Sequence, residues 1–452
     1  MLTSRQTRRM IALGLGLVGL GLAHRAQVWQ PAYVRPLWPV YPAIDPQADR
    51  YAALARVEGA TVLGNPAAQS YPDCGASFAR NPWDLIAWRD RLYIGLGDSS
   101  NEGPSTNAGP VPLLTYDPAP QRFGQEARLP EEQVDRFYRL DGDLWIPGDD
   151  PRQSWRWGNL YRRQGGWWWQ YRTLPQAIHT YPLAKWGDAL VAGVSITEAV
   201  PAGVGQAGYG SAVALSQDGG RHWRVVPLGG WRIFALLTVA GQRFAVDALP
   251  GPKLQAWLNQ EHRQAFHAPL YQYQEPDRFE RRPDLKAGVI FPQTPAAGQS
   301  TGIMERALTW GDRAAYIGSF YPPGSTYPVQ RAYLAHSLRR GAIAVEPIPL
   351  PADGLAFDLR LEGDSLEVLW AQPLANHRWR SQVWTSQTGH HWRPLVSFTA
   401  AAPARSFERL GDRYYLGLGS LTYPNPQACS PMDQVSGTLV VIPAIPPGSS
   451  GE

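Results

Sequence analysis

A short pattern recurs seven times along the chain and constrains its fold more than any other feature. Each copy has an extended apolar segment, a tight turn at Gly-Asp or an equivalent pair, and a second extended segment rich in aromatic residues. The copies occupy residues 85–95, 137–147, 181–191, 235–245, 307–317, 357–367 and 407–417. They begin about 45–70 residues apart, and periods of this size are typical of the blades of β-propellers.

A second pair of extended segments follows each of the first six copies. Two hairpins give four antiparallel strands, which is the content of one propeller blade. After the seventh copy the sequence shows one further strand, at residues 438–442. We therefore predict an all-β fold, a seven-bladed β-propeller of four-stranded antiparallel blades over residues 56–445.

The seventh blade lacks a fourth strand in this interpretation, and an unpaired sheet edge is a liability. Residues 56–63, directly before the first copy, contain the apolar stretch 60–63. We expect this segment to supply the missing strand, so that an N-terminal strand closes the ring. Residues 24–55 are assigned to a linker and residues 446–452 to a disordered tail.

The two cysteines of the chain, Cys74 and Cys429, flank the array of copies. These two places are neighbours in a closed ring. An even number of cysteines in an exported protein favours a disulfide bond. We predict a Cys74–Cys429 bridge that pins the closure, with two free thiols as the alternative.

Residues 1–23 have the features of an export signal. Arg5, Arg8 and Arg9 form a positive segment, residues 10–23 are apolar, and small residues near position 23 suit cleavage. The apolar run is shorter than the about 20 residues that a membrane-spanning helix needs. We predict a periplasmic or secreted protein; an uncleaved N-terminal anchor, the one expected contact with a membrane, is the alternative.

The charge of the chain argues against a nucleic-acid partner. The net charge is +4, and without the three arginines of residues 1–23 it is +4 − 3 = +1. The chain has no run of five or more Lys or Arg residues, whereas binding to phosphates needs a concentrated basic surface. We expect a monomer whose partner is a glycan or another extracellular polar ligand.

One second hairpin contains Ser216, Asp218, Gly220 and Trp223 in the spacing Ser-x-Asp-x-Gly-x-x-Trp. This motif resembles the Asp-box, or bacterial neuraminidase repeat, of sialidase-like β-propellers. Its carboxylate suits the backbone N–H groups of its own turn, and its Trp is a large apolar plug between blades. We expect Asp218 and Trp223 to be structural, because the motif argues for a fold and not for an activity.

The resemblance implies further residues for an active sialidase: an arginine triad that grips a carboxylate, a Tyr/Glu nucleophile pair and an Asp acid. The family's Arg-Ile-Pro signature belongs near the first blade, where this chain has Ala-Arg-Asn-Pro at residues 79–82. The nearest string, Trp-Arg-Ile-Phe at residues 231–234, lies in the middle of the chain and lacks the Pro. Catalytic residues are therefore left unassigned.

The connections between the two hairpins of a blade are long and irregular, whereas the turns within hairpins are short. In an antiparallel blade these long connections share one face, and binding residues concentrate on loops that a rigid scaffold holds. Sugar rings stack on aromatic side chains, and their hydroxyls pair with planar polar groups. Ordinary solvated loop residues are the alternative. The residues predicted to line the mouth of the central channel and bind a polar ligand are Asp98, Asn107, Asp149, Asp150, Trp155, His179, Arg306 and Arg405.

The sequence thus predicts an exported, non-catalytic propeller that binds a glycan or another extracellular ligand on its loop-rich face. A sialidase-like glycoside hydrolase using two carboxylates and a scaffold for envelope assembly are the alternatives. A facing carboxylate pair with clustered arginines would favour the enzyme, and a flat aromatic platform would favour binding. No cofactor is expected; Asp98 or the pair Asp149 and Asp150 could offer oxygen ligands to Ca²⁺, but no spacing is specific for it.

Overall fold

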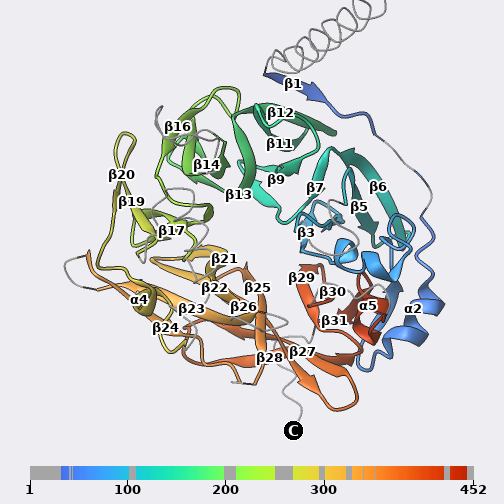
Figure 1. The fold of residues 1–452 in the computed structure, drawn as a ribbon. Coiled ribbons are helices and arrows are strands. Elements are labelled where there is room, and N and C mark those ends of the chain that lie inside the picture. The colour runs from blue at the N-terminus through green and yellow to red at the C-terminus, as the bar shows by residue number, and fades with distance from the viewer. Residues whose placement is uncertain are drawn as a thin grey trace, which may run out of the picture.

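The computed structural model describes residues 32–39, 42, 44–100, 108–197, 210–249, 268–294, 301–321, 328–338, 341–351, 353–421 and 428–444. The predicted signal, the predicted tail and Asn107 lie outside these ranges. Within them the chain forms a seven-bladed β-propeller, with the blades in sequence order around a ring (Figure 1). The predicted fold class is confirmed.

Each of the first four blades contains four antiparallel strands in sequence order, and the sheets of blades 2 and 3 carry additional edge strands. Blade 1 contains β3 (Asp84–Trp88), β4 (Arg91–Gly95), β5 (Val111–Asp117) and β6 (Arg122–Leu129). Blade 2 contains β8 (Tyr138–Leu140), β9 (Asp143–Pro147), β11 (Trp157–Gln164) and β12 (Trp167–Pro175). Blade 3 contains β13 (Ala177–Trp186), β14 (Ala189–Ile196), β15 (Gly210–Ser216) and β16 (Arg224–Pro227). Blade 4 contains β17 (Ile233–Val239), β18 (Gln242–Asp247), β19 (Leu270–Gln274) and β20 (Arg278–Arg281).

The remaining blades follow the same plan, except that blade 7 borrows one strand from the N-terminal side. Blade 5 contains β21 (Thr301–Trp310), β22 (Arg313–Tyr321), β23 (Val329–Ser337) and β24 (Ile343–Pro347). Blade 6 contains β25 (Leu355–Glu362), β26 (Ser365–Leu374), β27 (Arg378–Ser386) and β28 (Arg393–Ala400). Blade 7 contains β29 (Ala404–Leu410), β30 (Arg413–Leu418), β31 (Leu439–Pro443) and β2 (Thr61–Gly64).

The turns of the inner hairpins explain the recurring glycine. In the Gly-Asp turns only the glycine has a positive φ, as a type II′ turn requires; these glycines are Gly187, Gly311, Gly363 and Gly411, with φ of 56–65°. Two other inner turns have positive φ at both central residues. Asp141 and Gly142 have φ of 52° and 77°, and Ala240 and Gly241 have φ of 46° and 77°. Two successive residues with positive φ form a type I′ turn, whose twist matches that of the strands it joins. The first strands lie innermost, since those of neighbouring blades contact one another, for example β17 with β21 and β29 with β3.

The core of the described chain consists of seven apolar clusters, one at each interface between neighbouring blades. Successive residues of a strand point to opposite faces of its sheet. Accordingly Tyr414 packs toward blade 6, while the next residue, Tyr415, packs toward blade 1. Each blade therefore buries both of its faces, and this explains why the strands of the sequence are apolar on both sides.

The ring closes where the sequence predicts. Strand β2 pairs antiparallel with β31, with Thr61 opposite Val441. Cys74 and Cys429 form the predicted disulfide, with their Cα atoms 6.0 Å apart. Arg80 also holds the ends of the ring together, which the sequence analysis did not predict. This buried side chain donates hydrogen bonds to the backbone oxygens of Ser436 at 3.0 Å and Asp433 at 2.7 Å.

Part of the segment assigned to a linker, residues 24–55, is ordered on the ring, which corrects that assignment. Strand β1 (Tyr33–Pro36) pairs with β12 as a fifth strand of blade 2, and helix α2 (Ala48–Ala55) packs on the closure. A four-residue strand bounded by prolines and an eight-residue helix carry little periodic signal, so the pattern did not indicate them.

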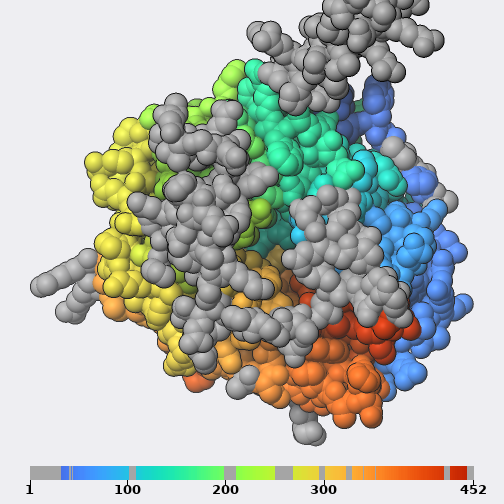
Figure 2. All heavy atoms as spheres, in the orientation of Figure 1, coloured from blue at the N-terminus to red at the C-terminus, as the bar shows by residue number. Residues whose placement is uncertain are grey.

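Short helices complete the described structure and lie between strands. They are η1 (Cys74–Ala76), η2 (Phe78–Arg80), α4 (Ala287–Ile290) and α5 (Pro431–Val435). Among the helices in the described ranges, none has the length and apolarity that crossing a membrane requires. Figure 2 shows all heavy atoms in the same orientation, with the surface hollowed near the centre of the ring.

Candidate functional site

Two short strands extend the innermost edge of blade 3. Strand β7 (Glu131–Gln133) pairs with β10 (Asp149–Pro151), and β10 pairs with β13, so that Asp149 lies opposite His179. The sequence analysis treats this second-blade connection as irregular, and β10 corrects that view. Because residues paired across antiparallel strands project from the same face of the sheet, the pairing brings these two side chains together.

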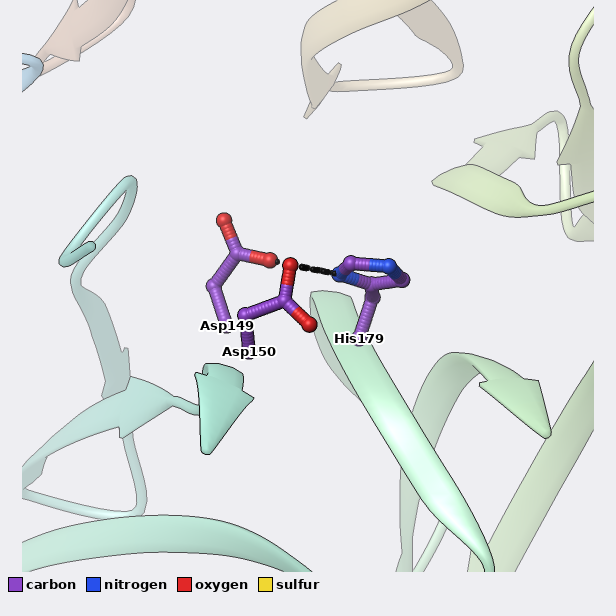
Figure 3. A group of neighbouring side chains, drawn as sticks. All are labelled: Asp149, Asp150 and His179. Atoms are coloured by element: carbon purple, nitrogen blue, oxygen red, sulfur yellow. Dashed lines mark hydrogen bonds and ion pairs between the residues drawn. The ribbon is translucent and has the colours of Figure 1, made fainter. Parts of the chain in front are cut away.

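Asp149, Asp150 and His179 form the centre of the candidate site (Figure 3). The Nδ1 atom of His179 lies 2.9 Å from Oδ1 of Asp149 and 3.4 Å from Oδ2 of Asp150. All three residues are buried, with at most 8% of their surface exposed. Figure 3 shows both carboxylates beside the same edge of the imidazole ring. Their ligand atoms lie within 4.8 Å of one another, so these residues could hold a metal ion.

Burial controls the protonation of this group. It lowers the pKa of His179 to about 4, helped by the charge of Arg232 and opposed by the bond to Asp149, so the imidazole is neutral at neutral pH. Burial and the adjacent Asp149 carboxylate raise the pKa of Asp150. Burial likewise raises the pKa of nearby Glu131 to about 8, although hydrogen bonds from Tyr161 and Asn159 oppose the shift.

A row of aromatic rings continues from His179 into blade 4. The rings of His179 and Tyr181 are stacked with centroids 5.6 Å apart, and those of Tyr181 and Phe234 with centroids 4.6 Å apart. Trp231 follows at 6.0 Å from Phe234. Arg232 lies over the Trp231 ring at 4.6 Å and donates to the Tyr181 hydroxyl at 2.9 Å. Except for His179, these side chains are partly exposed.

Arg306 occupies a different part of the channel and is already paired. Its guanidinium lies 3.8 Å from Asp84 of blade 1 and 3.5 Å from Asp358 of blade 6. It also donates to the backbone oxygens of Trp83 and Asp135. Burial raises the pKa of both carboxyls, to about 7 for Asp84, and the charge of Arg306 opposes the shift. These contacts give Arg306 a bracing role between blades.

Arg405 is engaged in a similar way. Its guanidinium lies 4.5 Å from the centre of the Trp83 ring and 5.6 Å from that of Phe357, and it donates to the backbone oxygen of Ser420 at 2.9 Å. Burial lowers its pKa to about 10.

The inner strands of blades 3 to 7 carry irregularities of register that place these side chains. Breaks in pairing occur between Ile233 and Ala235, between Glu305 and Leu308, and between Ala404 and Ser406. A β-bulge re-aims the extra residue, and bulges are common beside functional sites. Phe234 and Arg405 lie within two of these breaks, and Arg306 and Ala307 lie within the third. Their orientation depends on the bulge, which a strict alternation of inward and outward residues does not indicate.

The structure brings together part of the predicted site. Asp98, Asp149, Asp150 and His179 lie in one neighbourhood, linked by Ser99, whose hydroxyl donates to Asp149 at 3.0 Å. Asp98 itself accepts the backbone N–H of Ser100 at 3.0 Å, which is an Asx turn.

Trp155 adjoins residues that contact the outer strands of blade 2. It is 46% exposed. The neighbouring residues Gln153 and Ser154 contact Tyr33 of β1 and Arg172 of β12, the outermost strands of blade 2. The prediction that Trp155 lines the channel mouth therefore gains no support from these contacts.

Sequence reasoning missed Tyr181, Arg232 and Phe234 as candidates. The sequence analysis interprets residues 231–234 only as an incomplete Arg-Ile-Pro signature. Its combination of two aromatics with an Arg directly before an inner strand was the available signal.

The turn at Asp218 has the geometry that the sequence analysis expects of a structural device. The carboxylate accepts the backbone N–H groups of Arg221 at 3.1 Å and His222 at 2.9 Å. Trp223 is half-buried between blades 2 and 3, and its indole N–H donates to Thr173 of β12 at 3.1 Å and to the Gly220 oxygen at 3.0 Å.

Comparisons with known proteins give fold-level likeness. No family model matches the chain, and no curated protein does. The extracellular domain of a hybrid two component system from B. thetaiotaomicron aligns with 80% of this chain at 10% identity and a TM-score of 0.41, and this chain covers 40% of it. The β-propeller domain of the Trilobed protease from Pyrococcus furiosus aligns with 69% of this chain and 83% of its own, at 10% identity and a TM-score of 0.35. A xylan beta-1,4-xylosidase from Bacillus Halodurans C-125 aligns with 67% of this chain and 65% of its own, at 12% identity and a TM-score of 0.33.

Proposed function

We propose that this chain is an exported β-propeller that binds a glycan on its loop-rich face, beside Asp149 and His179. The observation that supports the proposal most directly is the aromatic row formed by His179, Tyr181, Phe234 and Trp231 next to buried carboxylates and Arg232. Sugar rings stack on aromatic faces, and charged planar groups pair with their hydroxyls. The disulfide agrees with an oxidising compartment outside the cytosol.

The ion pairs made by Arg306 favour binding without catalysis over a sialidase-like hydrolase. A sialidase needs arginines that are free to grip the substrate carboxylate, whereas Arg306 is paired with Asp84 and Asp358. The Asp218 turn supports membership of the Asp-box propellers, which is a statement about architecture. Release of aryl alcohol from aryl glycosides or aryl sialosides, lost in Asp149→Asn, would instead favour the enzyme.

A glycan array probed with the purified chain tests the proposal. We expect one class of glycan to bind, and Phe234→Ala to weaken that binding about two- to tenfold, since an aromatic contact contributes about 0.5–1.5 kcal/mol. Trp155→Ala is the matched control, because it removes an exposed aromatic ring next to residues that contact the outer strands of blade 2. A chain that binds no glycan, or one that loses binding in Trp155→Ala but not in Phe234→Ala, would contradict the proposal.

A further inference from the structure

We propose that Asp149, Asp150 and His179 bind a divalent transition-metal ion, with Zn²⁺ as the reference probe. The inference does not depend on glycan binding, because metal binding is measured without a glycan. Three observations carry it: the positions of the ligand atoms, a cluster of buried carboxyl groups with few cationic partners, and an unpartnered hydroxyl beside the imidazole.

The ligand atoms already lie at separations that suit one small cation. The Nδ1 atom of His179 is 2.9 Å from Asp149 Oδ1 and 3.4 Å from Asp150 Oδ2. Zn²⁺ bonds to imidazole nitrogen and carboxylate oxygen are about 2.0–2.2 Å long, so the edges of a tetrahedral site are about 3.3–3.5 Å. All three ligand atoms lie within 4.8 Å of one another, and movement of the two carboxylates toward these separations would complete that geometry. Three protein ligands leave the fourth position open to water or to a ligand.

The buried carboxyl groups around these residues outnumber their Arg and Lys partners. Strands β7 and β10 place four buried carboxylates close together, those of Glu131, Glu132, Asp149 and Asp150. Arg152 pairs with Glu132 at 3.2 Å. Over the described part of the chain, neither Asp149, Asp150 nor Glu131 makes an ion pair with Arg or Lys, and Oε2 of Glu131 has no hydrogen-bond partner. Buried carboxylates without a cation are costly, and a divalent ion would offset that cost.

A second, independent feature points to a ligand at the same place. Ser195 of β14 lies opposite His179 in the sheet, as Asp149 does on the other side. Its side chain therefore projects from the face that carries the imidazole. The Ser195 residue is 0% exposed, and in the described ranges its Oγ has no hydrogen-bond partner. A hydroxyl buried in this way needs a polar neighbour, and a water bound to the ion would provide one.

The mixed ligand set selects the kind of metal. Ca²⁺ and Mg²⁺ take oxygen ligands, whereas imidazole suits Zn²⁺ and neighbouring first-row ions. The structure therefore replaces the Ca²⁺ alternative of the sequence analysis with an ion of borderline softness. Ca²⁺ serves as the negative probe.

Calorimetric titration of the EDTA-treated full chain with ZnCl₂, MnCl₂ and CaCl₂ tests this site. We expect about one Zn²⁺ per chain with a Kd of about 1 μM or below, and at least about 100-fold weaker Ca²⁺ binding. Asp150→Asn and His179→Gln should each weaken Zn²⁺ binding at least about tenfold. His222→Gln is the matched control: His222 also bonds to an aspartate, Asp218, at 2.5 Å, but its side chain is 90% exposed. It should bind Zn²⁺ as the unmodified chain does.

X-ray absorption at the zinc edge keeps the test decisive if a variant fails to fold, because it uses the unmodified chain. One nitrogen and two or more oxygen ligands at about 2.0–2.1 Å would support the site. Absence of stoichiometric Zn²⁺ binding, a preference for Ca²⁺, equal loss in His222→Gln, or a spectrum with several imidazoles would each overturn the proposal.

Discussion

Asp149 and Asp218 are both aspartates bonded to a histidine, yet their surroundings give them opposite roles. Asp218 lies in an exposed turn, where slight desolvation is outweighed by hydrogen bonds from His222 and Ser216, which lower its pKa to about 2. Asp149 is 2% exposed and stands beside a second carboxylate and a buried imidazole. The first holds a turn together, whereas the second belongs to the group for which a ligand is proposed. Residue type alone does not separate them.

Trp223 offers a test of the structural role of its turn. Its ring is packed between blades 2 and 3, and its N–H bonds to Thr173 across the interface. We expect Trp223→Ala to lower the free energy of unfolding by about 3 kcal/mol, the lower end for a large-to-small change because the ring is only half-buried. Urea unfolding measures this change. Trp155→Ala should change the free energy of unfolding by no more than about 0.5 kcal/mol. Equal losses of stability in the two variants would contradict the structural role of Trp223.

At the scale of elements, hairpins and their closure were predictable, whereas irregular strands were not. Seven copies of one hairpin pattern predict a ring of seven blades. Closure of that ring brings residues 60–63 beside the last strand and brings the two cysteines together. The pairing of Asp149 with His179 could not be inferred, because β7 and β10 are three-residue strands without periodicity. Phe234, Arg306 and Arg405 owe their orientation to register breaks, which no alternation pattern reveals.

The closure at blade 7 gives a prediction at this scale. The disulfide joins residues 355 positions apart, and in the chain-entropy model so long a loop contributes about 6 kcal/mol to stability, less any strain. The variant with both Cys74→Ser and Cys429→Ser should lose up to this amount and still fold, because β2 and Arg80 also hold the ends together. Adding Arg80→Met should lower the denaturant midpoint further. An unchanged midpoint would show that the hydrogen bonds of Arg80 contribute nothing to stability.

For the whole molecule, the polar centre of the ring divides into two parts that are joined by hydrogen bonds. Ser99 links Asp149 to Gln133, and Gln133 donates to Asp135 at 3.4 Å. Arg306 donates to the backbone of Asp135 from the opposite side. One part therefore carries the candidate ligand site, and the other braces blades 1, 5 and 6 across the channel.

Replacement of Arg306 should destabilise the protein more at high pH than at low pH. Asp84 has a folded-state pKa of about 7, above its ordinary value, so its ionisation costs stability as pH rises from about 4 to about 7. Arg306 offsets that cost for both Asp84 and Asp358. In Arg306→Met the offset is lost, and we expect a loss of about 3–5 kcal/mol at pH 8 but a smaller loss at pH 5, where the carboxyls are protonated.

Urea unfolding of the unmodified chain and the variant at both pH values measures this difference. Arg313→Met is the control from the same blade. Arg313 stacks on Trp310 at 3.8 Å and donates to the Thr388 oxygen at 2.6 Å. Within the described residues it has no carboxylate partner. The stability lost in Arg313→Met should therefore not depend on pH. A loss in Arg306→Met that is the same at pH 5 and pH 8 would show that the Asp84 and Asp358 charges do not need Arg306, and would remove the electrostatic account of the brace.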